Sequence, residues 1–360
     1  MKKLLVLALA IPLASVASAA PRASTPARLV TKRPVSALAA DGGRAALVIP
    51  GRGADPQEPP WQIVVWEPTS HRLLTIHTER DAYGGVGVAL AGSRVAWDDC
   101  SSCAGNTLTT RVSSATLARR SPVSLGSDDG AEGPAGGEIL APSGDGTLLA
   151  YTDQQRCDEN GDYEPCPPGR QPGDVVDSTI WRAAARGRCP TSFSDGDSRR
   201  PGHCAPVARA HGKLMVLDVD AGRIAARTDH GVRLLTGAGR RLLDLPLTNV
   251  SGAALSGNRL AVKVPGSLEV YDAGTGKLLA TIPSQSGDRL EDLKAGILVT
   301  ANGKTVTLRR SSDGHTAAFH AAGYARARLE HPGLFIAGGR RVTFTPMADV
   351  RRALEAGSLK

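Results

Sequence analysis

An acidic loop between two cysteines is the part of this sequence best suited to metal chemistry. In "CDENGDYEPC" four side chains with oxygen atoms alternate with other residues, namely Asp158, Asn160, Asp162 and Glu164. Such oxygens are the ligands of a hard cation such as calcium. Gly161 and Tyr163 break the EF-hand pattern, however, so the sequence favours the other interpretation, a solvated acidic loop stapled by its cysteines.

The cysteines are expected to form disulfides. All six lie within one span of the chain: Cys100, Cys103, Cys157, Cys166, Cys189 and Cys204. Six thiols allow many pairings, so the connectivity stays open, but proximity favours pairing each cysteine with its nearest neighbour in sequence. "CSSC" at 100–103 also has redox spacing. It follows a predicted strand and does not open a helix, so a structural disulfide is favoured over a redox or metal site.

Motifs for nucleophilic or zinc-dependent catalysis are missing from the sequence. There is no G-x-S-x-G and no H-E-x-x-H, and the eight histidines are scattered over predicted turns and strand ends. A lone histidine of this kind is expected to be a surface residue. No catalytic residue and no cofactor site is therefore predicted, and calcium at the acidic loop is the one metal considered.

The N-terminus has the pattern of a secretory signal peptide. Two lysines precede an apolar run over 4–13, and small residues follow at Ala17 and Ala19. The run is shorter than the about 20 residues that span a bilayer, so cleavage after Ala19 is predicted. No later stretch is apolar and long enough to span a membrane. We therefore expect residues 1–19 to be removed and the protein to be secreted or held in the cell envelope.

The charge argues against nucleic acid as a partner. The formal net charge is +8, and it falls to +6 without the two lysines of the signal peptide. The arginines occur singly or in pairs such as Arg119-Arg120 and Arg340-Arg341, with no basic run and no interleaved aromatic residues. This distribution is typical of solvated strand ends. Loose attraction to an anionic cell envelope remains compatible with it.

Behind these side chains lies a repeated strand pattern. "LEVYDAGTGKLLATIP" at 268–283 has counterparts in "IVVWEPTSHRLLTI" from Ile63, "LTTRVSSATLARRS" from Leu108 and "VTLRRSSDGHTAAF" from Val306. Each has an apolar alternation, a turn of small or polar residues, and a second apolar run. This pattern predicts β-hairpins.

A second recurring piece, a small-residue strand with a Gly turn and a more apolar strand, precedes these hairpins. Its copies start near 35, 86, 138, 213, 250, 290 and 327. Two hairpins in series make a four-stranded meander, and most spacings match the roughly 40 to 50 residues of a propeller blade. The sequence thus predicts an all-β fold, a β-propeller of seven four-stranded blades, over 34–355. Two packed β-sandwiches are the rival architecture.

The ends of the repeat array and one long unit depart from the pattern. The last unit lacks a clean fourth strand, and "ARLVTK" from the N-terminal arm at 20–33 is expected to supply it and close the ring. The third unit is much longer than the others. We interpret about 154–205 as a Cys-rich insertion, with "STIWRAAA" from Ser178 as the third strand of that blade.

The segment "YDAGTGKLLATI" at 271–282 resembles the repeats of the quinoprotein-like and WD-like propeller superfamily, of bacterial secreted type. The chain has Leu and Ala where catalytic quinoproteins place a docking Trp, and its single Trp-Asp pair, Trp97-Asp98, falls in a second strand of its unit, not a third. The resemblance therefore implies a fold and no particular activity.

The expected function is that of an exported, non-enzymatic propeller that binds a protein or another ligand at or outside the cell envelope. One face of the disc, with the insertion of the third blade, is the expected contact surface. A propeller enzyme of quinoprotein, lactonase or lyase type is the alternative, and an acidic or His cluster at the channel mouth would favour it. A structural envelope component held by charge is a third alternative.

Overall fold

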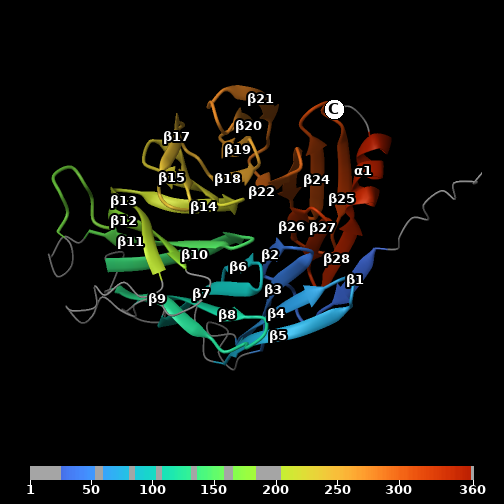
Figure 1. The fold of residues 1–360 in the computed structure, drawn as a ribbon, viewed down its shortest axis with the longest axis horizontal. Helices are drawn as coiled ribbons and strands as arrows, with labels where there is room; N and C mark the ends of the chain where they lie inside the picture. The colour runs from blue at the N-terminus through green and yellow to red at the C-terminus, as the bar shows by residue number, and fades with distance from the viewer. Residues whose placement is uncertain are drawn as a thin grey trace, which may run out of the picture.

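The predicted seven-bladed propeller is confirmed by a computed structural model, which describes residues 26–52, 60–80, 86–102, 108–130, 136–157, 165–183 and 204–357. In the described chain, antiparallel strands radiate from a central channel, and one helix lies at the rim (Figure 1). Among these residues, no helix has the length and apolar character that crossing a membrane requires.

The first three blades are formed by β2 (Ala37–Asp41), β3 (Arg44–Pro50), β4 (Trp61–Glu67), β5 (Arg72–Glu79); β6 (Val88–Ala91), β7 (Arg94–Ser102), β8 (Leu108–Thr116), β9 (Val123–Gly130); and β10 (Gly136–Asp145), β11 (Leu148–Arg156), β12 (Val175–Ala183), β13 (Cys204–His211). The next three are β14 (Leu214–Asp220), β15 (Arg223–Thr228), β16 (Gly231–Thr236), β17 (Arg241–Pro246); β18 (Gly252–Ser256), β19 (Arg259–Val264), β20 (Ser267–Asp272), β21 (Leu278–Pro283); and β22 (Arg289–Lys294), β23 (Ile297–Asn302), β24 (Thr305–Arg310), β25 (Thr316–His320). Blade seven consists of β26 (Ala325–Glu330), β27 (Gly333–Gly338), β28 (Arg341–Pro346) and the N-terminal β1 (Ala27–Val30).

Blade five illustrates how the sequence specifies a blade. The second strand, β19, is mostly buried, whereas the outermost strand, β21, alternates between half-buried and exposed residues because only one of its faces meets a neighbouring blade. At the turn before β21, Asp272 Oδ1 accepts hydrogen bonds from the N–H groups of Gly274 and Thr275. Gly276 then adopts φ +72°, which favours glycine.

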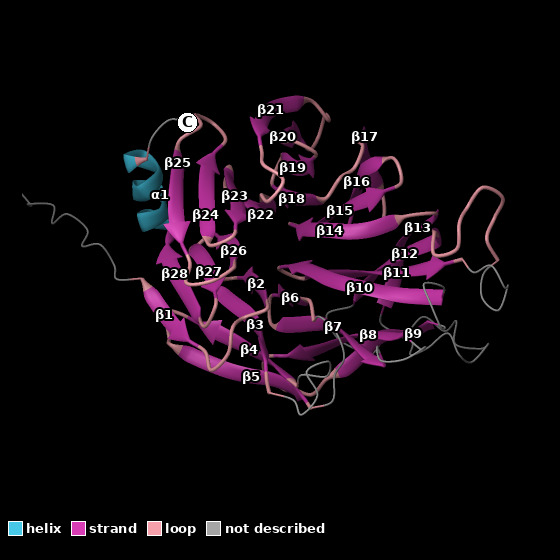
Figure 2. Cartoon of the chain, turned by 180° about the vertical axis from the view of Figure 1, so that it is seen from behind, coloured by secondary structure: helices cyan, strands magenta, loops and turns pink. Residues whose placement is uncertain are grey.

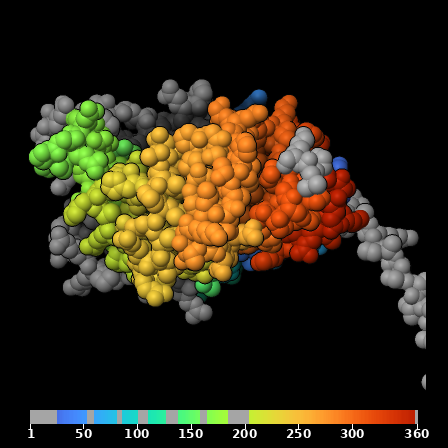
Figure 3. All heavy atoms as spheres, turned by 90° about the horizontal axis from the view of Figure 1, so that it is seen from above, coloured from blue at the N-terminus to red at the C-terminus, as the bar shows by residue number. Residues whose placement is uncertain are grey.

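Large aromatic side chains pack where blades seven, one and two meet. Trp66 of blade one contacts the edge of Phe335 of blade seven at 6.2 Å between ring centroids, and Phe335 lies 4.8 Å from Phe344. Trp97 of blade two is also fully buried. Elsewhere Leu, Val, Ile and Ala fill the spaces between blades, and blades four to six lie side by side along the rim (Figure 3).

The N-terminal strand closes the ring as expected. β1 pairs antiparallel with β28, and Leu29 lies opposite Val342. The Thr31 N–H donates to the Arg340 carbonyl at 2.8 Å. The last blade therefore contains both ends of the repeat array.

A C-terminal helix was not expected from the sequence. Helix α1 (Met347–Ala356) buries Met347, Val350 and Leu354, and these side chains pack on the apolar cluster between blades six and seven. Figure 2 shows the helix in cyan against β25 and β28. The spacing of the three residues is that of one apolar helix face.

The insertion in the third unit is shorter than its predicted bounds of 154–205. Residues 154–156 belong to β11, 204–205 belong to β13, and 175–183 form β12, the third strand expected from "STIWRAAA". Blades two and three are also joined into one sheet, because β9 and β10 pair through Gly130 and Gly136.

Candidate functional site

The innermost strand of each blade ends at a tight turn on the same side of the disc. The last residues of these strands, in blade order, are Asp41, Ala91, Asp145, Asp220, Ser256, Lys294 and Glu330. Because the strands occupy equivalent places around the axis, these residues form a ring across the channel. We call it the charged ring, since four of its members are acidic and one is basic.

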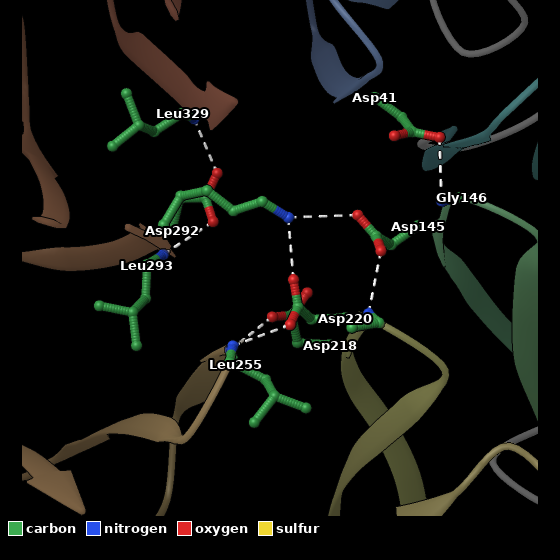
Figure 4. A network of polar contacts seen from close by, with 12 residues as sticks. Asp41, Asp145, Gly146, Asp218, Asp220, Leu255, Asp292, Leu293 and Leu329 are labelled. Atoms are coloured by element: carbon green, nitrogen blue, oxygen red, sulfur yellow. Dashed lines mark hydrogen bonds and ion pairs between the residues drawn. The ribbon is translucent and has the colours of Figure 1, made fainter. Parts of the chain in front are cut away.

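Three carboxylates of the charged ring are fixed by backbone N–H groups of following blades. Asp41 Oδ2 accepts hydrogen bonds from Gly92 and Gly146, the latter at 3.0 Å. Asp145 Oδ2 accepts from Ala221 at 3.0 Å, and Asp220 Oδ2 accepts from Gly257 at 3.0 Å (Figure 4). A turn in one blade is thereby tied to the strand end of another, and one oxygen of each carboxylate has a fixed position.

Lys294 is the only cation of the charged ring. Its Nζ lies 2.8 Å from Asp220 Oδ1 and 3.2 Å from Asp145 Oδ1, so it bridges two blades other than its own. Burial alone would lower the pKa of Lys294, but the hydrogen bond to Asp220 and the charges of Glu330 and Asp145 together raise it. The ammonium group is therefore held charged between two carboxylates.

Glu330 differs from the other carboxylates of the ring. Its side chain is 7% exposed, and among the described residues it has neither a hydrogen bond nor an ion pair. Burial raises the pKa of Glu330 to about 9; Lys294 opposes this, while the charges of Asp292, Asp41 and Asp145 add to it.

Two further acidic residues, Asp218 on β14 and Asp292 on β22, lie two residues before the ring members of their strands. Asp218 Oδ2 accepts a hydrogen bond from the Leu255 N–H at 2.6 Å, and Asp292 Oδ2 accepts one from Leu329 at 2.7 Å (Figure 4). Burial raises the pKa of Asp218 to about 7, and the charge of Asp292 adds to it. Burial also raises the pKa of Asp292, against the attraction of Arg328.

The raised pKa of Asp218 predicts a pH-dependent stability. Its ordinary value is 3.8, so between about pH 4 and about pH 7 the folded state binds more protons than the unfolded state. The free energy of unfolding should fall as the pH rises through this window. Asp218→Asn should remove on the order of 4 kcal/mol of that fall, since a change of one in pKa corresponds to about 1.4 kcal/mol. Urea unfolding at several pH values measures it.

Asp244→Asn is the matched control for this prediction. Asp244 is an exposed carboxylate on β17 that pairs with Arg233 and Arg241. This variant should keep the pH slope of the unmodified protein. If the free energy of unfolding fell equally with pH in Asp218→Asn and in the unmodified protein, the raised pKa of Asp218 would be contradicted.

The charged ring lies between two cavities on the propeller axis. A chamber of about 700 Å³ is lined by the inner strands of all seven blades. A second cavity of about 630 Å³ is lined by Asp145 of blade three and by the strand ends and turns of blades one, four, five, six and seven. Both share Asp145, Asp220, Lys294 and Glu330. The ring is thus the floor of the chamber and the boundary with the second cavity.

The chamber has two unlike walls. Blades one to four contribute small apolar residues such as Ala37, Val88 and Val216. Blades six and seven contribute Glu291, Asp292, Arg326 and Arg328 to the opposite side. Blades three and four also contribute Asp145, Asp218 and Asp220, so charged groups line the chamber beside its apolar residues. A chamber of this size, with both apolar and charged parts, is suited to hold a small ligand in a set orientation.

Arginines surround one buried glutamate on the charged wall. Glu291 Oε1 lies 2.9 Å from Arg289 Nε, and its carboxylate lies 3.9 Å from Arg328 and 4.0 Å from Arg326. Tyr324 is 57% exposed. The guanidinium group of Arg289 lies 3.9 Å from the centroid of its ring, and the guanidinium group of Arg326 lies 5.5 Å from the same centroid. Within the chamber lining, Arg326 and Arg328 stand beside Glu291 and Asp292, so this wall presents both guanidinium and carboxylate groups.

The charged ring contains none of the site residues that were predicted from sequence. The candidate calcium ligands Asp158, Asn160, Asp162 and Glu164 are outside the described residues, and so are Cys103 and Cys189. A disulfide joins Cys157 and Cys166, the pairing that proximity favours. Cys100 and Cys204 are disulfide-bonded as well, and their partners stay predictions.

The charged ring was missed by sequence motifs, although its signal is present. An acidic residue stands directly before the turn in "ALAAD-GG", "PSGD-GT", "LDVD-AG" and "RLE-HPG". The four are far apart in the chain and match no catalytic or metal motif. Aligning the repeats on their first turns would have placed them at one level of the channel.

Comparison with known proteins finds likeness in fold only. No family model and no curated protein matches the chain. Among solved structures, BamB from Moraxella catarrhalis is 11% identical with a TM-score of 0.47, over 89% of this chain and 99% of that one. Sqt1 from Saccharomyces cerevisiae is 11% identical with a TM-score of 0.46, over 90% and 98%. An acylaminoacyl peptidase is 11% identical with a TM-score of 0.50, over 86% of this chain and 52% of its own.

Proposed function

We propose that this protein is an exported binding propeller that holds a ligand with a carboxylate and an apolar chain in its axial chamber. The observation that carries the proposal is the pairing of two walls in one chamber of about 700 Å³. Arg326, whose side chain is 41% exposed, offers a guanidinium for a carboxylate. The small apolar residues opposite would receive the hydrocarbon part.

One further feature supports an extracytoplasmic place. The disulfide between Cys157 and Cys166 is of a kind that persists in oxidising compartments. It agrees with the signal peptide expected at the N-terminus.

The test is calorimetric titration of the purified protein with linear monocarboxylates, with primary alcohols of the same length as uncharged probes. Monocarboxylates should bind and alcohols should not. Arg326→Gln should weaken binding about 10-fold, because one charge-assisted hydrogen bond is lost. Arg241→Gln, which changes an exposed arginine on the outer strand β17, is the control and should bind as the unmodified protein does.

Equal binding of alcohols and monocarboxylates, or no binding of either by the folded protein, would refute the proposal. Loss of binding in Arg241→Gln to the same extent as in Arg326→Gln would refute the assignment of the charged wall.

An enzyme of lactonase or lyase type is the second candidate, and one observation favours it. Carboxyl groups with raised pKa values, Asp218 and Glu330, line the same chamber, and such groups cluster at catalytic sites. Turnover of a lactone or of a uronate-containing oligosaccharide, lost in Asp218→Asn with ligand binding retained, would support this candidate over a binding protein.

A further inference from the structure

Three carboxylates of the charged ring converge on one point of the propeller axis. Asp41, Asp145 and Glu330 come from blades one, three and seven, and each places a carboxylate oxygen within 4.8 Å of the others. Calcium is bound by oxygens at about 2.4 Å, so two ligands on opposite sides of the ion are about 4.8 Å apart. One ion can therefore contact all three side chains.

Glu330 supplies the second observation, independent of the clustering. The residue is 7% exposed, and its carboxyl group lacks a hydrogen bond or ion pair among the described residues. Ionising a buried carboxyl group costs several kcal/mol unless an opposite charge lies in contact with it. Lys294 does not reach Glu330 in an ion pair, because its ammonium group lies between Asp145 and Asp220.

The other two carboxylates are already oriented. Asp41 is held through Oδ2 by the N–H groups of Gly92 and Gly146, and no hydrogen bond is made to its Oδ1 by a described residue. Asp145 is held by Ala221 and Lys294. Ligands whose positions are fixed by such outer contacts are those that bind metal well.

The charge count points the same way. With all four carboxylates ionised and Lys294 charged, the ring has a formal charge of −3. A divalent cation would reduce this to −1, whereas Lys294 alone cannot balance it. The three converging side chains all offer carboxylate oxygens, which prefer hard cations.

We propose that Asp41, Asp145 and Glu330 bind one divalent cation of the calcium class on the propeller axis, with water completing its coordination. Blade seven and blade one are the two ends of the repeat array. The cation would therefore join these ends at the channel, while β1 joins them at the rim. This site is separate from the arginine wall and does not depend on the ligand proposed above.

The experiment uses the full purified protein, dialysed against EDTA and titrated in turn with calcium, magnesium and manganese. Calcium should bind with one ion per chain at this site and raise the melting temperature as its concentration increases. Glu330→Gln should weaken this binding ~100-fold, because it removes one charged ligand. Circular dichroism checks that the variant is folded, and Asp41→Asn provides a second variant with the same expected loss.

Two matched controls make the outcome specific. Glu138→Gln changes a carboxylate on the same strand as Asp145 that pairs with Arg156 outside the ring, and it should bind calcium as the unmodified protein does. Asp158→Asn with Asp162→Asn changes the acidic loop and should also leave the ring's binding intact.

Loss of all binding in the loop variant together with full binding in Glu330→Gln would overturn the proposal. So would the failure of the folded, unmodified protein to bind any of the three cations. Neither result would change the outcome of the monocarboxylate titration, so the two proposals can fail separately.

Discussion

Replacing Lys294 by methionine is expected to lower the free energy of unfolding by about 3 to 5 kcal/mol. The ammonium group bridges Asp220 at 2.8 Å and Asp145 at 3.2 Å, and its side chain is 10% exposed. Methionine keeps most of the volume and removes the charge, so two carboxylates lose their counter-ion in a poorly solvated channel. Urea unfolding followed by tryptophan fluorescence measures the loss.

Lys304→Met is the matched control, because Lys304 is an exposed lysine in the turn before β24. It should change stability by less than about 0.5 kcal/mol. Adding Asp220→Asn to Lys294→Met should recover part of the loss, since one of the uncompensated charges is removed. Equal stabilities for the Lys294 and Lys304 variants would show that the bridge contributes nothing.

Replacing Leu29 by aspartate is expected to cost about 2 to 4 kcal/mol and to expose an open sheet edge. Leu29 is half-buried and packs on the cluster that contains Phe335 and Phe344. A carboxylate at this position would lie against apolar side chains without a partner. Thermal unfolding and light scattering should report a lower melting temperature and more aggregation.

The next residue on the strand offers the control for this prediction. Val30 is 67% exposed and points to the opposite face of β1. Val30→Asp introduces the same charge into the same strand and should leave the melting temperature nearly unchanged. A similar drop in both variants would mean that strand pairing, not the packing of Leu29, limits stability.

The fold could be predicted because it is local and repeated. Each hairpin shows alternation of apolar residues with a turn of small residues, and the predicted starts lie within a few residues of the inner strands, as with 250 for β18 and 327 for β26. The closing strand followed from a missing fourth strand in the last unit. Helix α1 was overlooked because the segment after 346 was considered only as the end of that unit.

The candidate site could not be predicted in the same way, because its residues meet only through the closure of the ring. Asp41 and Glu330 are at opposite ends of the array, and they become neighbours when blade seven meets blade one. Sequence shows an acidic residue before several turns, but not which of these carboxylates find partners. The burial of Glu330 depends on seven strands arriving at one axis.

The pairing of the first strand with the last has a consequence for the order of events during synthesis. Thr31 and Arg340, which share hydrogen bonds beside β1 and β28, are 309 residues apart in sequence. The N-terminal strand β1 therefore stays unpaired until its partner β28, near the other end of the repeat array, has been synthesised. During that interval the growing propeller is an open arc that another chain could extend. The arc can become a ring only after its final blade has formed.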